Sequence, residues 1–519
     1  MDPLALNVTR CELVLSHDLY ERLQRHLFPG DGDEHGAVIT AGIARSSDGR
    51  MRLLARQLHL ARDGIDFVDG RRGYKMFRAE FVRDRILACA DDQLVYLNVH
   101  NHGGTDRVAF SRDDLDSHQR GYPTLLDLAD GLPVGALVFA QNAVAGDIWM
   151  PDGTRLALER TVVIGACRRV LLPHPEQTGY ASAGLYDRQT RIFGAAGQAV
   201  LRRSKVAIIG IGGVGALLVE YLARLGVGHF VLIEPERIDY TNLPRFAGAT
   251  RLDAMAWFFE GAFPQWIQRI AQHFCARKVR IARRVIRRAN PTAVIETFAT
   301  NFLEPVTASA VLDCDYLFLA ADSMGARLLF NAIVHQYLIP GVQVGAKVSA
   351  TEDGKISSIH TACRPVTPHS GCLMCNGLIN PAKLQEEGQT ARERRAQRYV
   401  DDDEVAAPSV ITLNADVASQ AATDFMFYMT GLTDPAANRG YLRFAPLTRE
   451  TFYEEPRQSP DCGECSALPG SRLARGDLGR RLPTYHRPMA PVPAEFGSTV
   501  GKLLRHFQSV SAIGRTGRM

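Results

Sequence analysis

The sequence contains no apolar run that approaches the length of a membrane span, and Met1-Asp2-Pro3-Leu4 begins no secretory signal. Charge is nearly balanced, because 60 Lys and Arg residues stand against 56 Asp and Glu. A net charge of +4 on a chain of this length gives no reason to expect a nucleic acid partner. No internal repeat is evident. These absences predict a cytoplasmic protein that uses neither a membrane nor nucleic acid.

The chain has a globular composition, with 46% hydrophobic and 22% charged residues, and its 519 residues are too many for one ordinary core. Short apolar strands with two helical stretches, near 17–28 and 74–89, predict an α+β domain at the start. After Tyr186, strands alternate with helices, which predicts a parallel α/β sheet. The predicted division is a first domain over 1–170, a linker over 171–182, a second domain over 183–470 and a poorly ordered basic tail over 471–519.

Four of the ten cysteines form two Cys-x-x-Cys pairs, Cys372 with Cys375 and Cys462 with Cys465. Four thiolates in this two-plus-two arrangement are typical of a structural zinc site, and a redox role is the alternative. The other six cysteines are scattered through mostly apolar surroundings, where we expect buried thiols.

Two histidines close an apolar run, residues 95–99, that predicts a strand. His100 and His102 are one residue apart, so their side chains point the same way, and Asp114 follows a short loop. Two imidazoles and one carboxylate are the protein ligands of a hydrolytic zinc ion with an open fourth position. Glu34 is the candidate proton acceptor, and Ser111 is the candidate donor to a developing oxyanion. The alternative is a histidine pair on a surface loop.

The order Glu34, His100-x-His102 and Ser111-x-x-Asp114 resembles the motif of the JAMM (JAB/MPN) metalloproteases, over about residues 8–165. The resemblance implies a cytidine-deaminase-like α+β fold. It also implies cleavage of peptide or isopeptide bonds that follow the C-terminal glycines of ubiquitin-like proteins. The sequence departs from the family at Gly103, where proline is common, and has one residue more than usual between His102 and Ser111.

A glycine-rich segment follows the predicted strand 205–209 and opens a helix. Glycines let the backbone turn tightly and let a phosphate approach the helix N-terminus. The pattern by itself fits NAD as well as ATP, and Glu234, at the end of the next predicted strand, suits the ribose of either nucleotide. The candidate nucleotide-binding glycines are Gly210, Gly212, Gly213 and Gly215.

Charged residues around this segment favour ATP. A hydride-transfer enzyme needs no ring of cations, whereas a reaction that places a carboxylate against an α-phosphate must neutralise triphosphate charge and hold magnesium. Arg188, Arg245 and Lys278 supply the positive charge, and Asp322 is the candidate magnesium ligand. Glu236 and Asn242 belong to the same set of motifs.

These motifs together resemble the ThiF/MoeB and ubiquitin-activating family over about residues 180–470. The resemblance implies a Rossmann-like domain that uses ATP and Mg²⁺ to adenylate a C-terminal glycine. By position, Glu234 would hold the ribose, Arg245 and Lys278 the phosphates, and Asp322 the metal. Arg188 would reach across a homodimer into the partner's site, and the four paired cysteines would hold zinc.

Ubiquitin-activating relatives usually carry a thioester cysteine after the first cysteine pair, and this chain has none between Cys375 and Cys462. Cys363 is a poor substitute. We therefore hypothesise that an acceptor nucleophile attacks the adenylate directly. A further departure is the aromatic insertion 254–274, which either packs on its own domain or docks a partner.

The sequence thus resembles bacterial fusions of a JAMM domain with a ThiF-type domain, and it predicts a bifunctional enzyme with ATP, Mg²⁺ and two zinc ions. One domain would activate the C-terminal glycine of a ubiquitin-like protein, and the other would trim or release that protein. The expected partners are the ubiquitin-like protein, an acceptor resembling a conjugating enzyme, and a second copy of the chain. Sulfur-carrier activation for thiocarboxylate formation is an alternative, and a degenerate docking scaffold is another.

Overall fold

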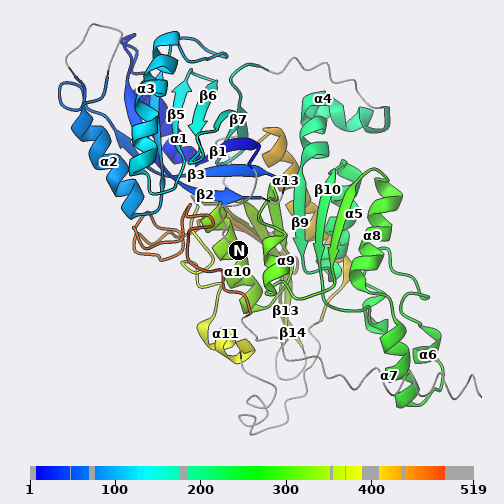
Figure 1. Ribbon diagram of the computed structural model, residues 1–519. Coiled ribbons are helices and arrows are strands. Elements are labelled where there is room, and N and C mark those ends of the chain that lie inside the picture. The colour runs from blue at the N-terminus through cyan, green and yellow to red at the C-terminus, as the bar shows by residue number, and fades with distance from the viewer. Residues whose placement is uncertain are drawn as a thin grey trace, which may run out of the picture. The chain divides into compact units, whose positions relative to one another are not determined.

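The computed structural model describes residues 8–46, 48–68, 76–175, 184–350, 355–368, 370–388, 408–433 and 440–485. Residues 1–483 form one compact unit (Figure 1). Most of the predicted linker and the predicted helix near 500–507 lie outside the described residues. Among the helices of the described ranges, none combines the length and apolar character needed to cross a bilayer.

The first part of the chain forms an eight-stranded mixed sheet in the order β1-β3-β2-β4-β5-β6-β7-β8, and β1 also pairs with β7, so the sheet closes on itself. Its strands are β1 (Arg10–Ser16), β2 (Gly36–Arg45), β3 (Arg50–Leu60), β4 (Val95–Asn101), β5 (Val134–Phe139), β6 (Val144–Trp149), β7 (Arg155–Ile164) and β8 (Arg168–Leu171). Its helices are α1 (His17–Leu27), α2 (Ala79–Asp91) and α3 (Arg112–Leu128). The mixed α and β composition predicted for this region is confirmed.

The second part forms another eight-stranded sheet, in the order β11-β10-β9-β12-β13-β14-β15-β16. The strands from β11 to β13 are parallel, and β14 to β16 continue antiparallel. The strands are β9 (Lys205–Ile209), β10 (His229–Ile233), β11 (Val294–Phe298), β12 (Tyr316–Leu319), β13 (Gly341–Ala350), β14 (Ile356–Val366), β15 (Tyr441–Ala445) and β16 (Glu450–Glu454). The predicted parallel α/β sheet is confirmed, with β9 at its predicted bounds.

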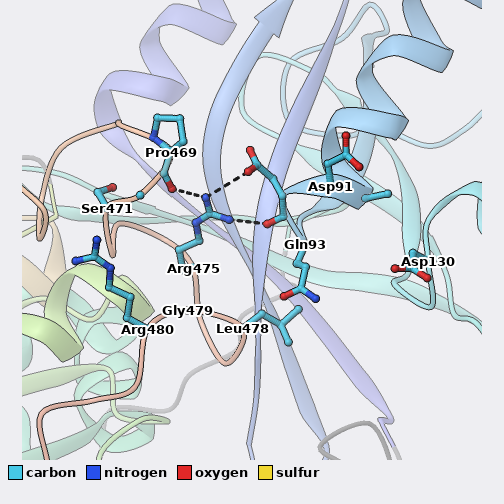
Figure 2. Close-up of a pocket in the computed structure, with 12 residues that line it drawn as sticks. Asp91, Gln93, Asp130, Pro469, Ser471, Arg475, Leu478, Gly479 and Arg480 are labelled. Carbon is cyan, nitrogen blue, oxygen red and sulfur yellow. Dashed lines mark hydrogen bonds and ion pairs between the residues drawn. The ribbon is translucent and has the colours of Figure 1, made fainter.

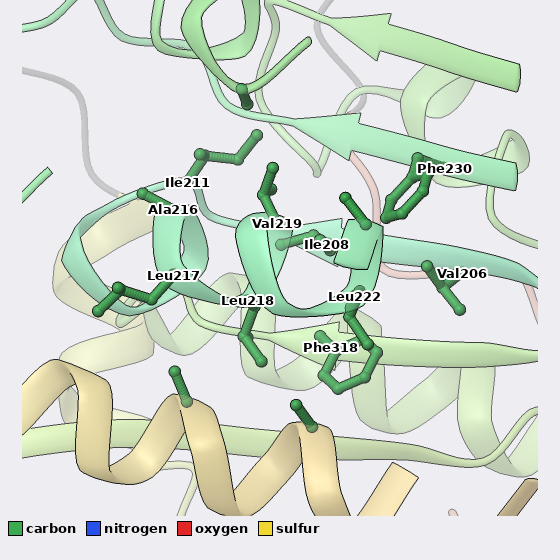
Figure 3. Packing of buried hydrophobic residues seen from close by; sticks show 14 of the residues in the cluster. Val206, Ile208, Ile211, Ala216, Leu217, Leu218, Val219, Leu222, Phe230 and Phe318 are labelled. Atoms are coloured by element: carbon green, nitrogen blue, oxygen red, sulfur yellow. The ribbon is translucent and has the colours of Figure 1, made fainter. Parts of the chain in front are cut away.

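Helices cover both faces of this second sheet. The helices are α4 (Asp187–Arg203), α5 (Gly213–Leu225), α6 (Trp257–Glu260), α7 (Gln265–Phe274), α8 (Lys278–Ala289), α9 (Pro305–Ser309), α10 (Met324–Tyr337), α11 (Pro381–Gly388) and α13 (Ile411–Thr430), with short 3-10 helices η1 (Gly184–Tyr186) and η2 (Tyr240–Asn242). One core cluster joins α5, α8 and α13 to the sheet, and Figure 3 shows Leu218 and Leu222 of α5 packed beside Ile208 and Phe318. A second cluster holds α9 and α10.

The two sheets share that second core cluster. Val14, Leu54 and Val162 of the first sheet belong to the same buried cluster as Leu317 and Ile333 of the second part. Burial of apolar side chains from both parts in one cluster removes their surface from water together. The division predicted at residues 171–182 therefore separates two sheets that each have a buried cluster of their own and share a third.

The chain after residue 470 differs from its predicted form as a poorly ordered tail, because residues 471–483 are placed and packed within the first compact unit. Ser471 and Ala474 are buried, and Gly476 pairs with Ile43 of β2. Arg475 donates to the Asp92 carbonyl at 2.6 Å and also bonds the Pro469 carbonyl (Figure 2). A run rich in Arg, Pro and Gly gave no periodic signal, because tertiary contacts and not a regular element hold it.

Gly42 offers a test of this packing. A Cβ at residue 42 would lie 2.1 Å from the Ala474 carbonyl oxygen, a backbone atom that has little room to move. We expect Gly42→Ala to lower the free energy of unfolding by about 1–3 kcal/mol, measured by chemical denaturation. Gly345→Ala, in β13, is the matched control, because the atom nearest to its Cβ position is Nε2 of Gln343, 3.7 Å away. Equal stability of the two variants would show that the 471–483 segment does not pack against β2.

Candidate functional site

The structure brings together the three candidate ligands of a hydrolytic zinc ion at the end of β4. The ligand atoms of His100, His102 and Asp114 all lie within 4.8 Å of one another. Nε2 of His102 is 3.3 Å from Oδ2 of Asp114, and Nε2 of His100 is 3.5 Å from Oδ1. Tetrahedral zinc with bonds of about 2.0–2.1 Å separates its ligand atoms by roughly 3.3 Å. The three residues therefore fit zinc in their present positions.

Neighbouring groups hold the two imidazoles with Nε2 facing the site. His102 Nδ1 lies 3.0 Å from the Ala109 carbonyl, and donation of an Nδ1 proton to that oxygen leaves Nε2 as the metal-binding atom. His100 Nε2 is buried and makes no hydrogen bond among the described residues. Such an orphaned nitrogen is costly unless a metal or another partner engages it.

Electrostatics favour an ionised carboxylate at this position. Burial opposes ionisation of Asp114, but the imidazoles of His100 and His102 beside its carboxylate outweigh it and hold the pKa of Asp114 well below its usual range. In turn, the Asp114 carboxylate, 3.3 Å from Nε2, raises the pKa of His102. Glu34 Oε1 lies 3.9 Å from His102 Nε2, so its carboxylate borders the site without occupying a ligand position.

The Ser111 hydroxyl, which is predicted to donate to an oxyanion, bonds to Asp114 in this structure. Ser111 is the N-cap of α3, and its Oγ and its backbone N–H both donate to Asp114 Oδ2 at 2.7 Å. The capping box fixes where α3 begins and where the Asp114 carboxylate points. Because its one proton is directed to Asp114, the hydroxyl must rotate before it can donate to a substrate oxyanion.

The glycine-rich segment lies at the switch point of the second sheet, where β9 is flanked by β10 on one side and β12 on the other. Ligands of open α/β sheets bind at this position. Gly210 has φ +88°, and a Cβ there would lie 2.7 Å from the Ala321 backbone nitrogen. A Cβ at Gly215 would lie 2.1 Å from the Gly210 carbonyl oxygen, so neither position tolerates a side chain. Gly212 is the N-cap of α5, and Gly213 is its first residue.

Glu234 and Lys278 meet beside this loop. Glu234 accepts hydrogen bonds from the backbone N–H of Ile211 at 2.8 Å and of Glu236 at 3.1 Å. Lys278 Nζ is 2.5 Å from a Glu236 carboxylate oxygen and 3.8 Å from Glu234. Burial raises the pKa of the Glu234 carboxyl in spite of the nearby ammonium group. The buried lysine and glutamate thus border the nucleotide loop, with lone pairs left on Glu234 for a ribose hydroxyl.

Two further predicted residues adjoin the same loop. The Arg245 carbonyl oxygen lies 3.4 Å from where a Cβ of Gly213 would stand, and its guanidinium donates to the Thr241 carbonyl. Asp322 is exposed and directly follows Ala321, the residue that contacts Gly210.

Asn242 supports these neighbours from a short distance along the chain. Its side chain accepts from the Asp239 backbone N–H at 3.2 Å within a capping box of η2. In this structure it therefore shapes the segment that carries Arg245.

Arg188 is not brought to the loop within one chain. It lies at the start of α4, where its neighbour Gln189 donates to the carbonyl of Arg224 at the last turn of α5. The glycine loop is at the other end of α5, whose 13 residues span roughly 20 Å. This exposed arginine therefore lies far from the glycine loop of its own chain.

Sequence reasoning missed Glu387. This α11 residue accepts hydrogen bonds from the backbone N–H groups of Met324 at 2.8 Å and Gly325 at 2.9 Å, at the N-terminus of α10. Its carboxylate thus lies at the start of the helix that closely follows Asp322 and complements the partial positive charge of the helix terminus. No local pattern marks the residue, because the contact joins segments about sixty positions apart.

The four paired cysteines converge as predicted. Their Sγ atoms are 3.7 Å apart in the Cys372–Cys462 and Cys375–Cys465 pairs, far beyond a disulfide bond. Tetrahedral zinc with Zn–S bonds of about 2.3 Å separates its sulfur atoms by roughly 3.8 Å. Backbone N–H groups of Ser459 and Glu464 point at two of the sulfurs, which suits thiolates. The four residues therefore fit a structural zinc ion, which would connect the segment after β14 to the segment after β16.

Zinc analysis tests both candidate metal centres. We expect two zinc equivalents in the purified protein, one for each cluster. Cys372→Ser with Cys465→Ser should remove one equivalent and lower the unfolding temperature, since structural zinc contributes folding free energy directly. The control Cys167→Ser, a cysteine outside the cluster, should keep both. Unchanged zinc content in the double variant would contradict the structural site.

Cys363 has the surroundings of an inert thiol. It is 1% exposed, and its Sγ lies 3.7 Å from an Asp424 carboxylate oxygen. Burial, reinforced by Asp424, raises the pKa of the Cys363 thiol well above its ordinary value. A nucleophilic cysteine needs the thiolate, which this environment disfavours.

The aromatic insertion forms α6 and α7, and most of its large side chains do not pack on their own domain. Trp266 is 63% exposed and Phe274 69%. Phe259 is an exception, stacked on Tyr240 with ring centroids 5.6 Å apart. The packing interpretation is therefore wrong for the α7 face, which leaves apolar surface open to a partner.

The second sheet, its glycine loop and the residues around it define a nucleotide-binding protein of the Rossmann-like class. The ThiF family model matches residues 186–467, and the chain belongs to the ThiF family.

Relatives match parts of this region. A 64-residue stretch is 38% identical to adenylyltransferase and sulfurtransferase UBA4 of Yarrowia lipolytica, covering 12% of this chain and 16% of the relative. A 206-residue stretch is 25% identical to ubiquitin-like modifier-activating enzyme 5 of Drosophila grimshawi, covering 37% of this chain and 46% of the relative. The chain thus spans less than half the length of these curated relatives. The crystal structure of E. coli MccB with succinimide matches 56% of this chain and 76% of its own, with 17% identity and a TM-score of 0.40.

Proposed function

We propose that the ThiF-family domain adenylates the C-terminal glycine of a ubiquitin-like protein. The observation that carries the proposal is the position of Glu234 and Lys278 beside a glycine loop at the sheet's switch point. Lys278 and Arg245 would neutralise the ATP phosphates, Glu234 would accept from the ribose, and Asp322 would hold Mg²⁺. The substrate carboxylate would then attack the α-phosphate, and pyrophosphate would leave with the electron pair of the broken P–O bond.

Adduct formation tests this activity. The full chain is incubated with ATP labelled at the α-phosphate and with ubiquitin-like proteins encoded beside its gene. We expect one of them to acquire the label in a bound, acid-stable form, and a version without its last glycine to acquire none. Labelling that ignores the terminal glycine would contradict the proposed substrate.

We propose a homodimer, which is supported by the placement of Arg188 at the far end of α5 from the loop of its own chain. In a dimer it would serve the partner's nucleotide. The exposed aromatic face of α7 supports a further protein partner, which we propose is an acceptor resembling a conjugating enzyme.

If an acceptor nucleophile attacks the adenylate directly, Cys363 takes no part in the reaction. We expect Cys363→Ala to form no less product than the unchanged protein, because a buried, protonated thiol is a poor nucleophile. Non-reducing gels of reactions with both proteins provide the measurement. A reducible adduct between the ubiquitin-like protein and the chain, lost in Cys363→Ala, would establish a thioester step instead.

We also propose that the first part of the chain is a zinc-dependent protease of the JAMM type acting on the same ubiquitin-like tail. The converged imidazoles and carboxylate support it, because their spacing fits tetrahedral zinc. Bound zinc would supply Lewis-acid chemistry, which polarises the carbonyl of the scissile bond and lowers the pKa of a bound water. Glu34 would take the proton of that water and deliver it to the leaving amine. Cleavage of fusions to the ubiquitin-like protein should be lost with a chelator and restored by zinc.

Activation of a sulfur carrier is the second candidate, and the similarity to an adenylyltransferase and sulfurtransferase favours it. A sulfide-level sulfur nucleophile would then attack the acyl carbon of the same adenylate, forming the C–S bond of the thiocarboxylate as AMP leaves with the electron pair of the broken C–O bond. Mass spectrometry of the product distinguishes the two: a thiocarboxylate terminus supports sulfur transfer, and an amide or ester to an acceptor supports conjugation.

A further inference from the structure

A pocket of about 400 Å³ opens beside the candidate zinc site, between α2, α3 and one face of β4. His100 and Asp114, two of the candidate ligands, form part of its wall, together with Glu34. The pocket is therefore continuous with the place where a scissile bond would lie, and a residue next to that bond would enter it.

Two regular rows of side chains lead from the metal ligands into the pocket. Alternate residues of β4 share one face, and residues four apart on α3 share another. The six residues are His100, Asn98 and Tyr96 on the strand, and Asp114, His118 and Tyr122 on the helix.

The inner part of this double row carries polar atoms without partners. The hydroxyl of Tyr96 and the Oδ1 of Asn98 are buried and have no hydrogen-bond partner among the described residues, and the buried Tyr122 hydroxyl has the Asn98 side-chain amide as its neighbour. Tyr96 is 1% exposed and Tyr122 4%. Buried polar atoms are nearly always satisfied, so these three are the points at which a guest would form hydrogen bonds. Asn98 Oδ1 can only accept, and the guest must therefore carry a donor.

His118 adds a fixed aromatic surface. Its Nδ1 lies 2.9 Å from the Asp147 carboxylate, which also accepts from Trp149 Nε1 at 3.1 Å. The imidazole ring packs against Tyr122 with centroids 4.8 Å apart and against Phe110 at 5.0 Å. A ring held in this way favours a flat guest packed beside it.

The remaining lining is apolar and carries little charge. Among the described residues that line the pocket, the one Lys or Arg is Arg83, which is exposed and paired with Asp84 at 2.8 Å. An anionic side chain would lose its hydration there without gaining an opposite charge, and the carboxylates of Glu34 and Asp114 line the pocket only at its metal-site end. The apolar lining residues are Phe67, Met76, Phe77, Val82, Ile86, Leu125 and Leu128.

We propose that this pocket binds the side chain of a tyrosine or tryptophan that directly follows the scissile glycine. Such a side chain combines a flat apolar body with one hydrogen-bond donor at its end. The inference rests on the proposed protease function, because a glycine on the acyl side has no side chain to offer and the guest must come from the leaving side. It makes the protein a processor of peptide-bonded precursors, in preference to lysine isopeptides.

Cleavage of matched peptides by the zinc-loaded full chain tests the proposal. The peptides place Tyr, Phe or Ala after a Gly-Gly sequence, and another joins the same tail to a lysine side chain. We expect kcat/KM for the Tyr peptide to exceed that for the Ala peptide and the isopeptide by at least ~10-fold. Tyr122→Phe should reduce the advantage of Tyr over Phe by ~3- to 10-fold, the effect of one neutral hydrogen bond.

Two further variants sharpen this result. Gly121→Phe should abolish the preference, because Gly121 lines the pocket and its Cβ position is open. Tyr441→Phe is the matched control and should preserve the preference, since Tyr441 is another buried tyrosine with an unpartnered hydroxyl outside the pocket. Equal cleavage of all four substrates would contradict the proposed guest of the pocket without contradicting the proposed protease function.

A binding measurement distinguishes failure of the pocket proposal from failure of the proposed protease function. If no peptide is cleaved, fluorescence anisotropy with the zinc-loaded Glu34→Gln protein still reports on the pocket. Tighter binding of the Tyr peptide than of the Ala peptide, lost in Tyr122→Phe, would support the pocket while the protease function falls. Equal binding of the two peptides would overturn the pocket as well.

Discussion

Replacing Lys278 by alanine should reduce partner-dependent ATP–pyrophosphate exchange by about 10²–10³-fold. The ammonium group is buried beside Glu234 and the nucleotide loop, where it meets the developing charge of the leaving pyrophosphate in a medium that screens poorly. Lys278→Arg should recover only part of the activity, because the guanidinium is larger and differently shaped.

Lys205→Ala is the matched control for this prediction. Lys205 is also paired with two carboxylates, Asp313 at 2.9 Å and Glu296 at 3.0 Å, but it lies at the opposite end of β9 from the glycine loop. Loss of stability in both variants, read from thermal unfolding, combined with loss of exchange in Lys278→Ala alone, would isolate the catalytic effect. Similar exchange rates in the two variants would show that Lys278 only stabilises the fold.

Glu34→Gln should lower zinc-dependent cleavage by about 10²–10⁴-fold while the zinc content stays unchanged. The amide keeps the size of the side chain but cannot accept a proton, and the three ligand residues are untouched. The measurement is kcat/KM on a fusion to the ubiquitin-like protein, beside zinc analysis of the same sample. Glu159→Gln, an exposed glutamate on β7, is the control and should cleave normally. Full activity in Glu34→Gln would remove this residue from the proposed mechanism.

The central elements of the second sheet could be predicted from the sequence because each is defined locally. The strand over 205–209 is apolar at nearly every position, as expected for a parallel strand covered on both faces. The glycines that follow it are required by close backbone contacts, as at Gly210 and Gly215. Likewise, His100 and His102 share a strand face, so their convergence follows from a two-residue repeat.

Long-range contacts account for what the sequence did not reveal. The contact of Glu387 with the start of α10 joins distant segments that no periodicity connects. The packing of residues 471–483 rests on close glycine contacts such as that of Gly476 with Ile43. The separation of Arg188 from the loop became clear only from the packing of α4 beside the end of α5. These features depend on tertiary structure, which local patterns do not encode.

The two candidate centres lie in the two parts of the chain, and these parts share a buried core cluster. Glu12 of β1 bonds Arg52 at 3.1 Å and Arg160 at 2.7 Å, and Arg52 also donates to the Leu338 carbonyl of the second part. Burial of such a charged network is favourable only when its members satisfy one another. The arrangement fits a protein that trims a C-terminal tail and then activates the glycine it exposes.

The most direct test of the central claim is ATP–pyrophosphate exchange by the full chain with a ubiquitin-like protein encoded beside its gene. Our account predicts exchange that requires the intact C-terminal glycine and Mg²⁺ and that disappears in Asp322→Ala. Exchange that persists in Asp322→Ala would contradict the site assignment. Exchange that is absent with every such partner, in a protein that retains its structural zinc and binds ATP, would contradict the adenylation function.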